Sequence, residues 1–596
     1  MKPILLSLTG IISIHLLALN AFATTVTWSS SASSTAWSLG SNWEGGTAPA
    51  AGDDVVIFGN TSGFAPSDAT GYSNIDLLSL TFQNSSSGAV DLQIVAPLKI
   101  GAGGINKTST ANLFLRSVNL AAGQTWTGSG NIFTDGAITG SKLNSDMPFM
   151  RFDANSPSWG GGLDVRQVVG MGNNGNFSAG SVNTPFGTGT ITLINRLNDG
   201  ITSTAPIVML TGRPGNEGAS TAQTLQNNIA LQNEGGGDFR IRQGWDTSSG
   251  TGHAYILSGE ISGNVSSKAL IFDNWLGSAA PATLILTGEN TYTSALTAID
   301  PNVTLQVGNG GTSGTLGTSQ VIISGTSGVL AFNRSDSVTI NNQIMGGGAL
   351  RQDGSGTTIL SGVNSYTGET TVSSGTLIVG SGGSIASSLL TTVGTGANLK
   401  VNGTAGSVKV NSGGSLGGSG TVGAVTLTTG SFLNPGNSPG LLTAASSSWA
   451  AGSTYNWEID NATGVAGTNW DLFSVTGALD MSALSSGSKM NLVLESLSLA
   501  NYSTSTPFSW TIAQAGSFTG TGFADGTNVT DLFNINATAF NSGNLPTNGF
   551  KVEVGTSGSL RTLNLMAIPE PSSHSMLLIG VGLTAVLFRR RLAKRA

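Results

Sequence analysis

The sequence of 596 residues contains no cysteine. This absence excludes disulfide bonds, thiolate metal ligands and cysteine nucleophiles together. A chain without disulfides must be held together by backbone hydrogen bonds and stacked side chains, and that requirement suits a solenoid of repeated β-strands.

Histidine is almost as scarce, with three residues in the chain. His15 lies in the N-terminal signal segment and His574 in the C-terminal tail, so His253 alone belongs to the body. The body therefore has almost no histidine from which a Ser-His-Asp triad or a multi-histidine zinc site could be built. We expect no catalytic residue, no metal site and no cofactor, and we interpret His253 as an ordinary solvated or packed residue.

Charged residues make up only 9% of the chain, far below the usual quarter. Acidic residues number 31 against 24 basic ones, which gives a net charge of −7. Nucleic-acid binding needs the opposite balance, so a nucleic-acid partner is excluded.

Glycine is abundant at 86 residues, yet hydrophobic residues still form 39% of the chain. Aliphatic residues recur in alternation with threonine and serine, which predicts half-buried strands. Glycine is needed wherever the chain turns sharply with positive φ. The composition therefore favours many short strands joined by tight turns over a disordered chain.

Two segments repeat one pattern. Residues 357–380 read TTILSGVNSYTGETTVSSGTLIVG, and residues 284–308 read LILTGENTYTSALTAIDPNVTLQVG. The turn residues Asn290 and Tyr292 correspond to Asn364 and Tyr366. Fixed spacing around a shared turn predicts a repeating β architecture.

These segments closely resemble the autotransporter-associated β-strand repeat, whose core is approximately LxLxGxNTYTGxTTVxxGTLxV. The resemblance implies stacked coils of a right-handed parallel β-helix in a surface-exposed bacterial protein, and it implies no reaction. The predicted fold is thus all-β: a right-handed parallel β-helix (solenoid) with a C-terminal β cap, plus a short C-terminal membrane-spanning helix. Alternation places Leu377 and Val379 inside the coil. Asn290 and Asn364 suit amide ladders between identical stacked side chains.

Residues 1–23 form a secretory signal peptide. Lys2 supplies the positive start, residues 4–19 the apolar core, and Ala21 and Ala23 the small-residue cleavage site. Cleavage would leave Thr24 as the first residue.

Residues 24–60 are predicted to be the N-terminal cap of the solenoid. They contain Trp28, Trp37 and Trp43 and resemble the W…NW…P…GDxVxF opening of proteins that carry these repeats. A solenoid exposes its terminal coil unless something covers it, and large aromatic side chains can do so. The alternative is that the three indoles form a platform for sugar rings.

The parallel β-helix is predicted over residues 61–445, with recognisable repeats at 284–308 and 357–380. The Pro/Gly-rich stretch 434–440 breaks the pattern and predicts a boundary. Residues 446–566 are richer in aromatic residues and are predicted to form a C-terminal β subdomain that closes the solenoid.

Residues 567–596 combine Pro569-Glu570-Pro571 with an apolar run and then Arg589, Arg590 and Arg591. This order closely resembles the PEP-CTERM sorting signal of Gram-negative bacteria. The resemblance implies an exosortase-type processing enzyme as a partner. Residues 575–588 would enter the inner membrane transiently, with the arginines held on the cytoplasmic side.

Some β-helix enzymes cleave acidic polysaccharides with paired aspartates and a basic residue. Asp53-Asp54 and Arg240-Ile241-Arg242 superficially resemble parts of the polygalacturonase pattern, but the Gly-His-Gly element between them is missing. Residues 418–423 match GxGxxG, a match expected by chance in so glycine-rich a chain.

The sequence predicts a non-catalytic, secreted surface or extracellular-matrix solenoid with a structural or adhesive function. It would cross the inner membrane and reside at the cell surface, outer membrane or matrix of a Gram-negative bacterium. The alternative is a β-helix protein that binds or cleaves a polysaccharide, with an exopolysaccharide or other surface glycan as its partner.

Overall fold

The computed structural model describes residues 23–29, 32, 36–59, 67–68, 75–84, 90–94, 97–171, 182–196, 205–210, 222–243, 254–274, 281–520 and 522–570. The chain divides into two compact units, with Met1–Met150 and Ser158–Gly161 in unit 1, and Arg151–Pro157 and Gly162–Ala596 in unit 2. Regular structure in the described residues is β, apart from the 3₁₀ helices η1 (Gly40–Asn42), η2 (Thr530–Leu532) and η3 (Phe540–Gly543).

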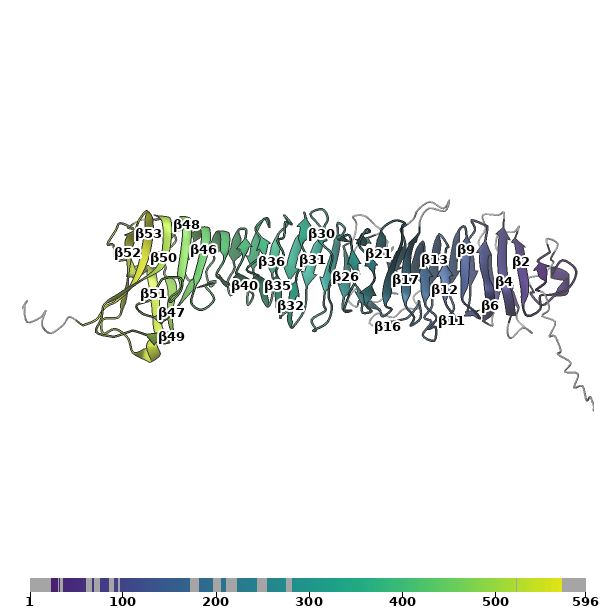
Figure 1. Ribbon diagram of the computed structural model, residues 1–596, viewed down its shortest axis with the longest axis horizontal. Helices are drawn as coiled ribbons and strands as arrows, with labels where there is room; N and C mark the ends of the chain where they lie inside the picture. Colours follow the sequence, from purple (N-terminus) through teal and green to yellow (C-terminus); the bar gives the residue numbers. More distant parts are fainter. Residues whose placement is uncertain are drawn as a thin grey trace, which may run out of the picture. The chain divides into compact units, whose positions relative to one another are not determined.

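Unit 1 consists of short parallel strands stacked in two sheets (Figure 1). One sheet contains β1 (Thr25–Thr27), β2 (Asp53–Gly59), β4 (Ile75–Asn84), β6 (Leu98–Lys107), β9 (Gln124–Gly128) and β12 (Leu143–Ser145), with β8 (Val118–Leu120) and β11 (Ile138–Gly140) beside them. The other sheet contains β3 (Ser67–Asp68), β5 (Val90–Ile94), β7 (Leu113–Leu115) and β10 (Asn131–Thr134). The strand β13 (Phe149–Phe152) contains the boundary between the units.

The first part of unit 2 repeats this arrangement with strands of two to six residues. One stack comprises β14 (Leu163–Val165), β17 (Ile191–Arg196), β20 (Ile229–Glu234) and β23 (Ile261–Ser262). A second comprises β15 (Val168–Met171), β18 (Ile207–Leu210), β21 (Phe239–Gln243), β25 (Leu270–Asn274), β28 (Thr297–Ile299), β30 (Val321–Ile323) and β33 (Ile344–Gly346). The pair β24 (Asn264–Val265) and β27 (Thr293–Ser294) lies apart from both.

Two further sheets of unit 2 organise its C-terminal half, and we call them the long sheet and the short sheet. The long sheet contains β16 (Val182–Asn183), β19 (Gln223–Leu225), β22 (Ala254–Leu257), β26 (Ala282–Leu286), β29 (Val303–Val307), β31 (Val329–Phe332), β34 (Ala349–Gln352), β36 (Thr370–Val372), β38 (Ser384–Ile385), β39 (Thr391–Val393), β41 (Thr404–Ala405), β42 (Val408–Val410), β44 (Thr421–Leu427), β46 (Leu441–Ser448), β48 (Leu472–Asp480), β50 (Phe508–Thr519), β52 (Phe550–Ser557) and β53 (Leu560–Ala567). The short sheet contains β32 (Ser337–Ile340), β35 (Thr357–Leu360), β37 (Thr376–Val379), β40 (Asn398–Val401), β43 (Ser415–Gly418), β45 (Phe432–Pro435), β47 (Thr454–Asn461), β49 (Met490–Ala500) and β51 (Phe533–Ala539).

From β34 to β51 the chain alternates between the long sheet and the short sheet, so each coil contributes strands to both. Neighbouring strands pair in register and in parallel, as Thr376 does with Thr357 on one side and Asn398 on the other. Coil length varies: residues that lie level on neighbouring strands are 17 positions apart from Asn398 to Ser415 and 22 positions apart from Phe432 to Thr454. The structure is therefore a stack of parallel coils with β-helical organisation.

Alternation along each strand fills the interior, as the sequence predicts. In β37 the side chains of Leu377 and Val379 are fully buried, whereas Thr376 and Ile378 are half-buried on the outer side. Leu377 lies level with Leu399 of β40, which in turn lies level with Leu416 of β43. Aliphatic side chains at one register position thus form continuous columns, and the predicted inward face of β37 is confirmed.

The parallel stack continues beyond the predicted boundary at residue 445. Strand β47 pairs in parallel with β45, and β49 pairs in parallel with both β47 and β51. Antiparallel pairing appears where β53 folds against β50 and β52. The closing element in this part of the structure is thus the antiparallel trio β50–β53–β52, and the preceding strands are longer coils of the same solenoid.

Among the residues that the structure describes, no helix has the length and apolar character needed to cross a membrane. The segment for which the sequence predicts a membrane-spanning helix, 575–588, lies outside the described residues.

Candidate functional site

The three N-terminal tryptophans form one buried cluster in unit 1. The ring centroids of Trp28 and Trp43 lie 4.8 Å apart, and those of Trp37 and Trp43 lie 5.0 Å apart, with both pairs edge-to-face. The Trp43 indole N–H donates to the Trp37 carbonyl at 2.8 Å. Their side chains are 2%, 0% and 2% exposed, in the order Trp28, Trp37, Trp43.

This burial argues against the alternative of a sugar platform, because an indole must present a free face to stack on a pyranose ring. The cluster instead links the first strands of the unit. The Trp28 N–H donates to Val56 of β2 at 2.8 Å, and Trp28 forms an antiparallel bridge with Trp43. Large aromatic pairs contribute packing energy beyond their buried area, and the arrangement favours the capping interpretation.

The acidic and basic residues that resemble an enzyme pattern are each engaged locally. Asp53 accepts hydrogen bonds from the Thr24 hydroxyl at 2.6 Å and from the Ala50 N–H at 2.7 Å. In unit 2, Arg240 and Arg242 both pair with the buried carboxylate of Asp273, at 2.5 and 2.6 Å. These contacts give the residues structural roles on their own strands. His253 lies outside the described residues.

No group of three or more His, Asp or Glu side chains in the described ranges is placed to hold a metal ion. The GxGxxG match at 418–423 lies on the end of β43 and the start of β44. A pyrophosphate site of the dinucleotide type needs a helix N-terminus at this point, and the segment that follows the match is a strand.

The repeated Asn and Tyr positions fasten one coil to the next. Asn364 is 3% exposed; its Oδ1 accepts the Ile344 N–H at 2.9 Å and its Nδ2 donates to the Ser384 carbonyl at 3.0 Å. Asn290 repeats the pattern, accepting from Ile261 at 2.8 Å and donating to Thr315 at 2.7 Å. The predicted ladder of asparagine on asparagine is therefore wrong at these positions, because each amide satisfies backbone groups of the coils on either side.

The tyrosine that follows each asparagine is also buried. The Tyr366 hydroxyl lies 2.7 Å from the Thr370 hydroxyl, and the Tyr292 hydroxyl lies 3.0 Å from the Thr297 hydroxyl. Burial raises the pKa of both phenols, so they stay protonated. The turn that the two repeats share thus has a structural role, and it carries no exposed reactive group.

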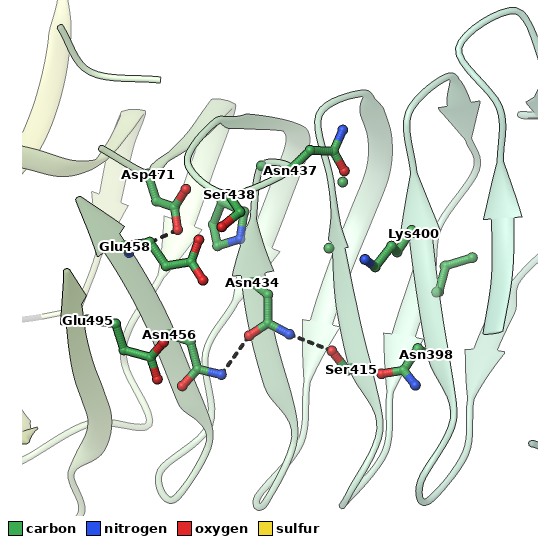
Figure 2. Close-up of a pocket in the computed structure, with 15 residues that line it drawn as sticks. Asn398, Lys400, Ser415, Asn434, Asn437, Ser438, Asn456, Glu458, Asp471 and Glu495 are labelled. Atoms are coloured by element: carbon green, nitrogen blue, oxygen red, sulfur yellow. Dashed lines mark hydrogen bonds between the residues drawn. The ribbon is translucent and has the colours of Figure 1, made fainter. Parts of the chain in front are cut away.

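The short sheet carries a polar hollow on its outer face, with a volume of about 520 Å³ (Figure 2). It lies across β40, β43, β45, β47 and β49, beside the turn of residues 436–440. Gly417 and Gly418 are part of its lining, and a Cβ atom at either position would press against a backbone oxygen of a neighbouring strand. The polar lining comes from Asn398, Lys400, Ser415, Asn434, Asn437, Ser438, Asn456, Glu458, Asp471 and Glu495.

Asp471 anchors one wall of this hollow. Its carboxylate accepts the Gly440 N–H at 2.7 Å and the Glu458 N–H at 3.0 Å, so it joins the turn to β47. The side chain is 1% exposed, and this burial raises its pKa to about 8 against the lowering effect of the two N–H donors. The Trp457 indole N–H donates to the Asp471 carbonyl at 2.8 Å.

Three charged side chains line the hollow more openly than Asp471 does: Lys400, Glu458 and Glu495. Glu458 and Glu495 occupy the same register position on adjacent strands. Within the described residues neither carboxylate, nor the Lys400 ammonium, takes part in an ion pair. Two like charges side by side on neighbouring strands oppose folding, so a compensating ligand would relieve them.

Sequence reasoning missed this hollow, since it treated residues 434–440 only as a boundary. Two signals were available: adjacent glycines at 417–418, and a Pro/Gly turn one coil later. What could not be read from the sequence is the register that brings Glu458 level with Glu495 across a coil of irregular length.

The sorting residues are only partly described. Strand β53 ends at Ala567, and the Pro569 carbonyl accepts a hydrogen bond from the Asn548 side chain at 2.8 Å. Glu570 is the last described residue, while Pro571 and the arginines Arg589, Arg590 and Arg591 lie outside the described part, as does Ala21 of the signal cleavage site. Ala23 is described and precedes β1.

Comparisons with known proteins agree with the repeated segments and the C-terminal sorting signal found in the sequence. The passenger-associated-transport-repeat family model matches residues 281–300 and 350–379, which overlap both repeated segments. The PEP-CTERM protein-sorting motif matches residues 567–591. A stretch of 94 residues is 42% identical to part of the Adhesin BmaC autotransporter of Brucella suis biovar 1 (strain 1330). That stretch covers 16% of this chain and 3% of the length of that protein.

The repeat and the sorting motif place the chain among proteins exported to the cell surface or extracellular space of Gram-negative bacteria. The chain is a protein with autotransporter-associated β-strand repeats and a PEP-CTERM sorting signal at residues 567–591.

Proposed function

We propose that the protein is a non-catalytic structural or adhesive component of the cell surface or extracellular matrix. The observation that carries the proposal is the repeated turn: the side-chain amides of Asn290 and Asn364 hydrogen-bond to backbone groups of the coils on either side. Tyr292 and Tyr366 hydrogen-bond to threonines close by in the sequence. Partial similarity to an adhesin autotransporter supports the same reading. Such a coil stack supplies a stiff, extended surface for contact.

The winding is proposed to be right-handed. Parallel strands joined by crossover connections adopt that hand in about 98% of cases because of the inherent strand twist. Each coil then adds about 4.8 Å along the stack. Each coil contacts only its neighbours. The repeated hydrogen bonds of the turns therefore provide much of the stability that a single core supplies in a globular protein.

The tail is proposed to hold the protein briefly at the inner membrane. As a helix, residues 572–588 would span about 26 Å, slightly less than the bilayer core of about 30 Å. Arg589 to Arg591 would resist export because moving a guanidinium charge through hydrocarbon is costly. An exosortase-type enzyme would then process the chain near Pro571, where proline keeps the backbone extended.

The adhesive function is tested in the native cells. A strain without the protein should lose attachment to surfaces or to other cells, and the full chain should restore it. A chain that ends at residue 566 should reach the medium without restoring attachment. Unchanged attachment in the deleted strain would overturn the proposal.

Polysaccharide binding is the second candidate function, and the polar hollow on the short sheet favours it. Its volume of about 520 Å³ falls within the usual range for ligand sites, about 300–1,000 Å³. Cleavage of a polysaccharide has less support, since the residues resembling that pattern are engaged in local contacts.

A further inference from the structure

The outer face of the short sheet carries a row of amide and hydroxyl groups across the hollow. The Asn456 side chain donates to the side-chain Oδ1 of Asn434 at 2.6 Å, and the Asn434 side chain in turn donates to the Ser415 hydroxyl at 2.6 Å (Figure 2). Asn398 lies level with Ser415 on the next strand. We call these four residues the amide row.

The row crosses four neighbouring strands that lie about 4.8 Å apart. It steps two residues along the strands between Ser415 and Asn434, because Asn434 lies level with Gly417. An amide offers both donors and an acceptor, and a hydroxyl offers one of each. Successive units of an extended sugar chain present hydroxyl groups at a similar interval. The amide row can therefore exchange hydrogen bonds with several consecutive sugar units.

The C-terminal end of the hollow is acidic. Glu458 and Glu495 lie level with each other on β47 and β49, and both line the hollow. Asp471 holds the backbone N–H of Glu458 at 3.0 Å and so fixes the strand at this point. A protonated amine placed between the two glutamates would form charge-assisted hydrogen bonds and remove their mutual repulsion.

An exposed aromatic ring lies beside the amide row. Phe432 and Asn434 flank the buried Leu433 on β45, so both side chains emerge on the outer face of the sheet. Phe432 is 37% exposed. Sugar rings stack their C–H faces on such rings, and the three N-terminal tryptophans, being buried, cannot do this.

We propose that the outer face of the short sheet around Asn434, Asn456, Glu458 and Glu495 is a binding site for an extended saccharide chain with free amino groups, of the hexosamine class. The amide row binds hydroxyl groups, the glutamate pair binds an ammonium group, and Phe432 packs against a pyranose face. At the opposite end of the hollow, Lys400 donates to a hydroxyl or carbonyl oxygen of the chain.

A basic peptide fits these features less well. The strands β43, β45 and β47 are paired on both sides, so their backbone groups are unavailable to a strand-like peptide. A peptide would bring cationic side chains to the glutamates but would leave the amide row without matching groups. A polyhydroxylated chain satisfies both parts of the site.

The inference deepens the proposed adhesive function and rests on it only for access to surface glycans. Binding by the purified protein can succeed while the cell attachment test fails, and the reverse is equally possible. The two proposals are therefore separable by experiment.

The test uses the full chain purified in detergent and titrated calorimetrically with a glucosamine hexamer or an N-acetylglucosamine hexamer. At about pH 5.5 the sugar amines are protonated and can donate charge-assisted hydrogen bonds. We expect the free-amine hexamer to bind at least about tenfold more tightly than the acetylated one, as is typical of a charge-assisted contact.

Three variants locate the binding. The double variant Glu458→Gln with Glu495→Gln should lose about tenfold or more in affinity for the amine hexamer. Phe432→Ala should weaken binding of both hexamers. Glu369→Gln, which removes an exposed carboxylate far from the hollow's lining, is the matched control and should bind like wild type.

Several outcomes would overturn the proposal. One is equal affinity of the double glutamine variant and the control, with both showing wild-type thermal unfolding. Another is a failure of either hexamer to bind the wild-type chain. A lysine hexapeptide that binds as tightly as the amine hexamer and displaces it would instead assign the site to a basic peptide.

Discussion

Replacing Leu377 with alanine tests the register on which the whole stack depends. Leu377 is fully buried in β37 and lies level with Thr358 of β35 and Leu399 of β40. The substitution opens a cavity inside one coil and removes contacts to the coils on both sides. Its neighbour Ile378 points outward on the same strand and is half-buried, so Ile378→Ala is a matched control.

The expected cost follows from burial. Truncating a fully buried leucine to alanine typically lowers the free energy of unfolding by about 2–5 kcal/mol, the loss of transfer energy plus the cavity left behind. Ile378→Ala removes a comparable side chain from the outer face and should cost about 1 kcal/mol or less.

Native-state hydrogen exchange on the full chain is the suitable assay, because a stack of coils need not unfold as a single unit. In the Leu377→Ala protein, amides of β35, β37 and β40 should exchange faster by roughly 30-fold or more, the rate ratio for about 2 kcal/mol. Amides of β4 and β6 in unit 1 serve as an internal reference. Equal acceleration by both variants would refute the assigned register.

Other consequences can be checked in the same way. Trp43→Ala should lower the free energy of unfolding by about 3–5 kcal/mol in urea titrations, and deletion of residues 24–60 should expose a sheet edge and cause self-association seen by size-exclusion chromatography. Asn364→Ala should cost about 1–3 kcal/mol, since it leaves the buried Ile344 N–H without its acceptor; exchange rates in β33 unchanged from wild type would contradict this. The raised pKa of Asp471 means that the folded state retains a proton that the unfolded state has released, so between about pH 4 and pH 8 stability should fall with rising pH by up to about 1.4 kcal/mol per unit. Asp471→Asn should lack this component, and parallel stability profiles of the two proteins would contradict the assignment. Serine in place of Arg589 to Arg591 should send unprocessed protein to the medium, detectable by immunoblot.

The repeating architecture could be predicted because the alternation of residues within short segments indicates it. Alternation in β37 predicts which side chains lie inside, and the structure confirms it for Leu377 and Val379. The shared Asn and Tyr positions also mark the turns correctly. Their partners could not be predicted, because an asparagine amide serves a neighbouring backbone as readily as another amide, and only the register decides between them.

The C-terminal region shows a second limit of the sequence. The aromatic residues of this region predict a separate subdomain, yet Trp457 lies on β47, which pairs in parallel with β49. Trp510 lies level with Leu565 in the antiparallel pairing of β50 with β53. The composition changes there because the coils become larger and need larger side chains to fill their interior. The hollow on the short sheet depends on the register between coils of unequal length, which the sequence does not show.

The most direct test of the account is mass spectrometry of the protein recovered from the surface of its native cells. We expect an N-terminal peptide that begins at Thr24 and a C-terminal peptide that ends near Pro571, since the signal peptide and the tail should both be removed after export. Peptides covering Leu592–Ala596, still joined to the surface protein, would contradict sorting by cleavage and leave a simple membrane anchor in its place.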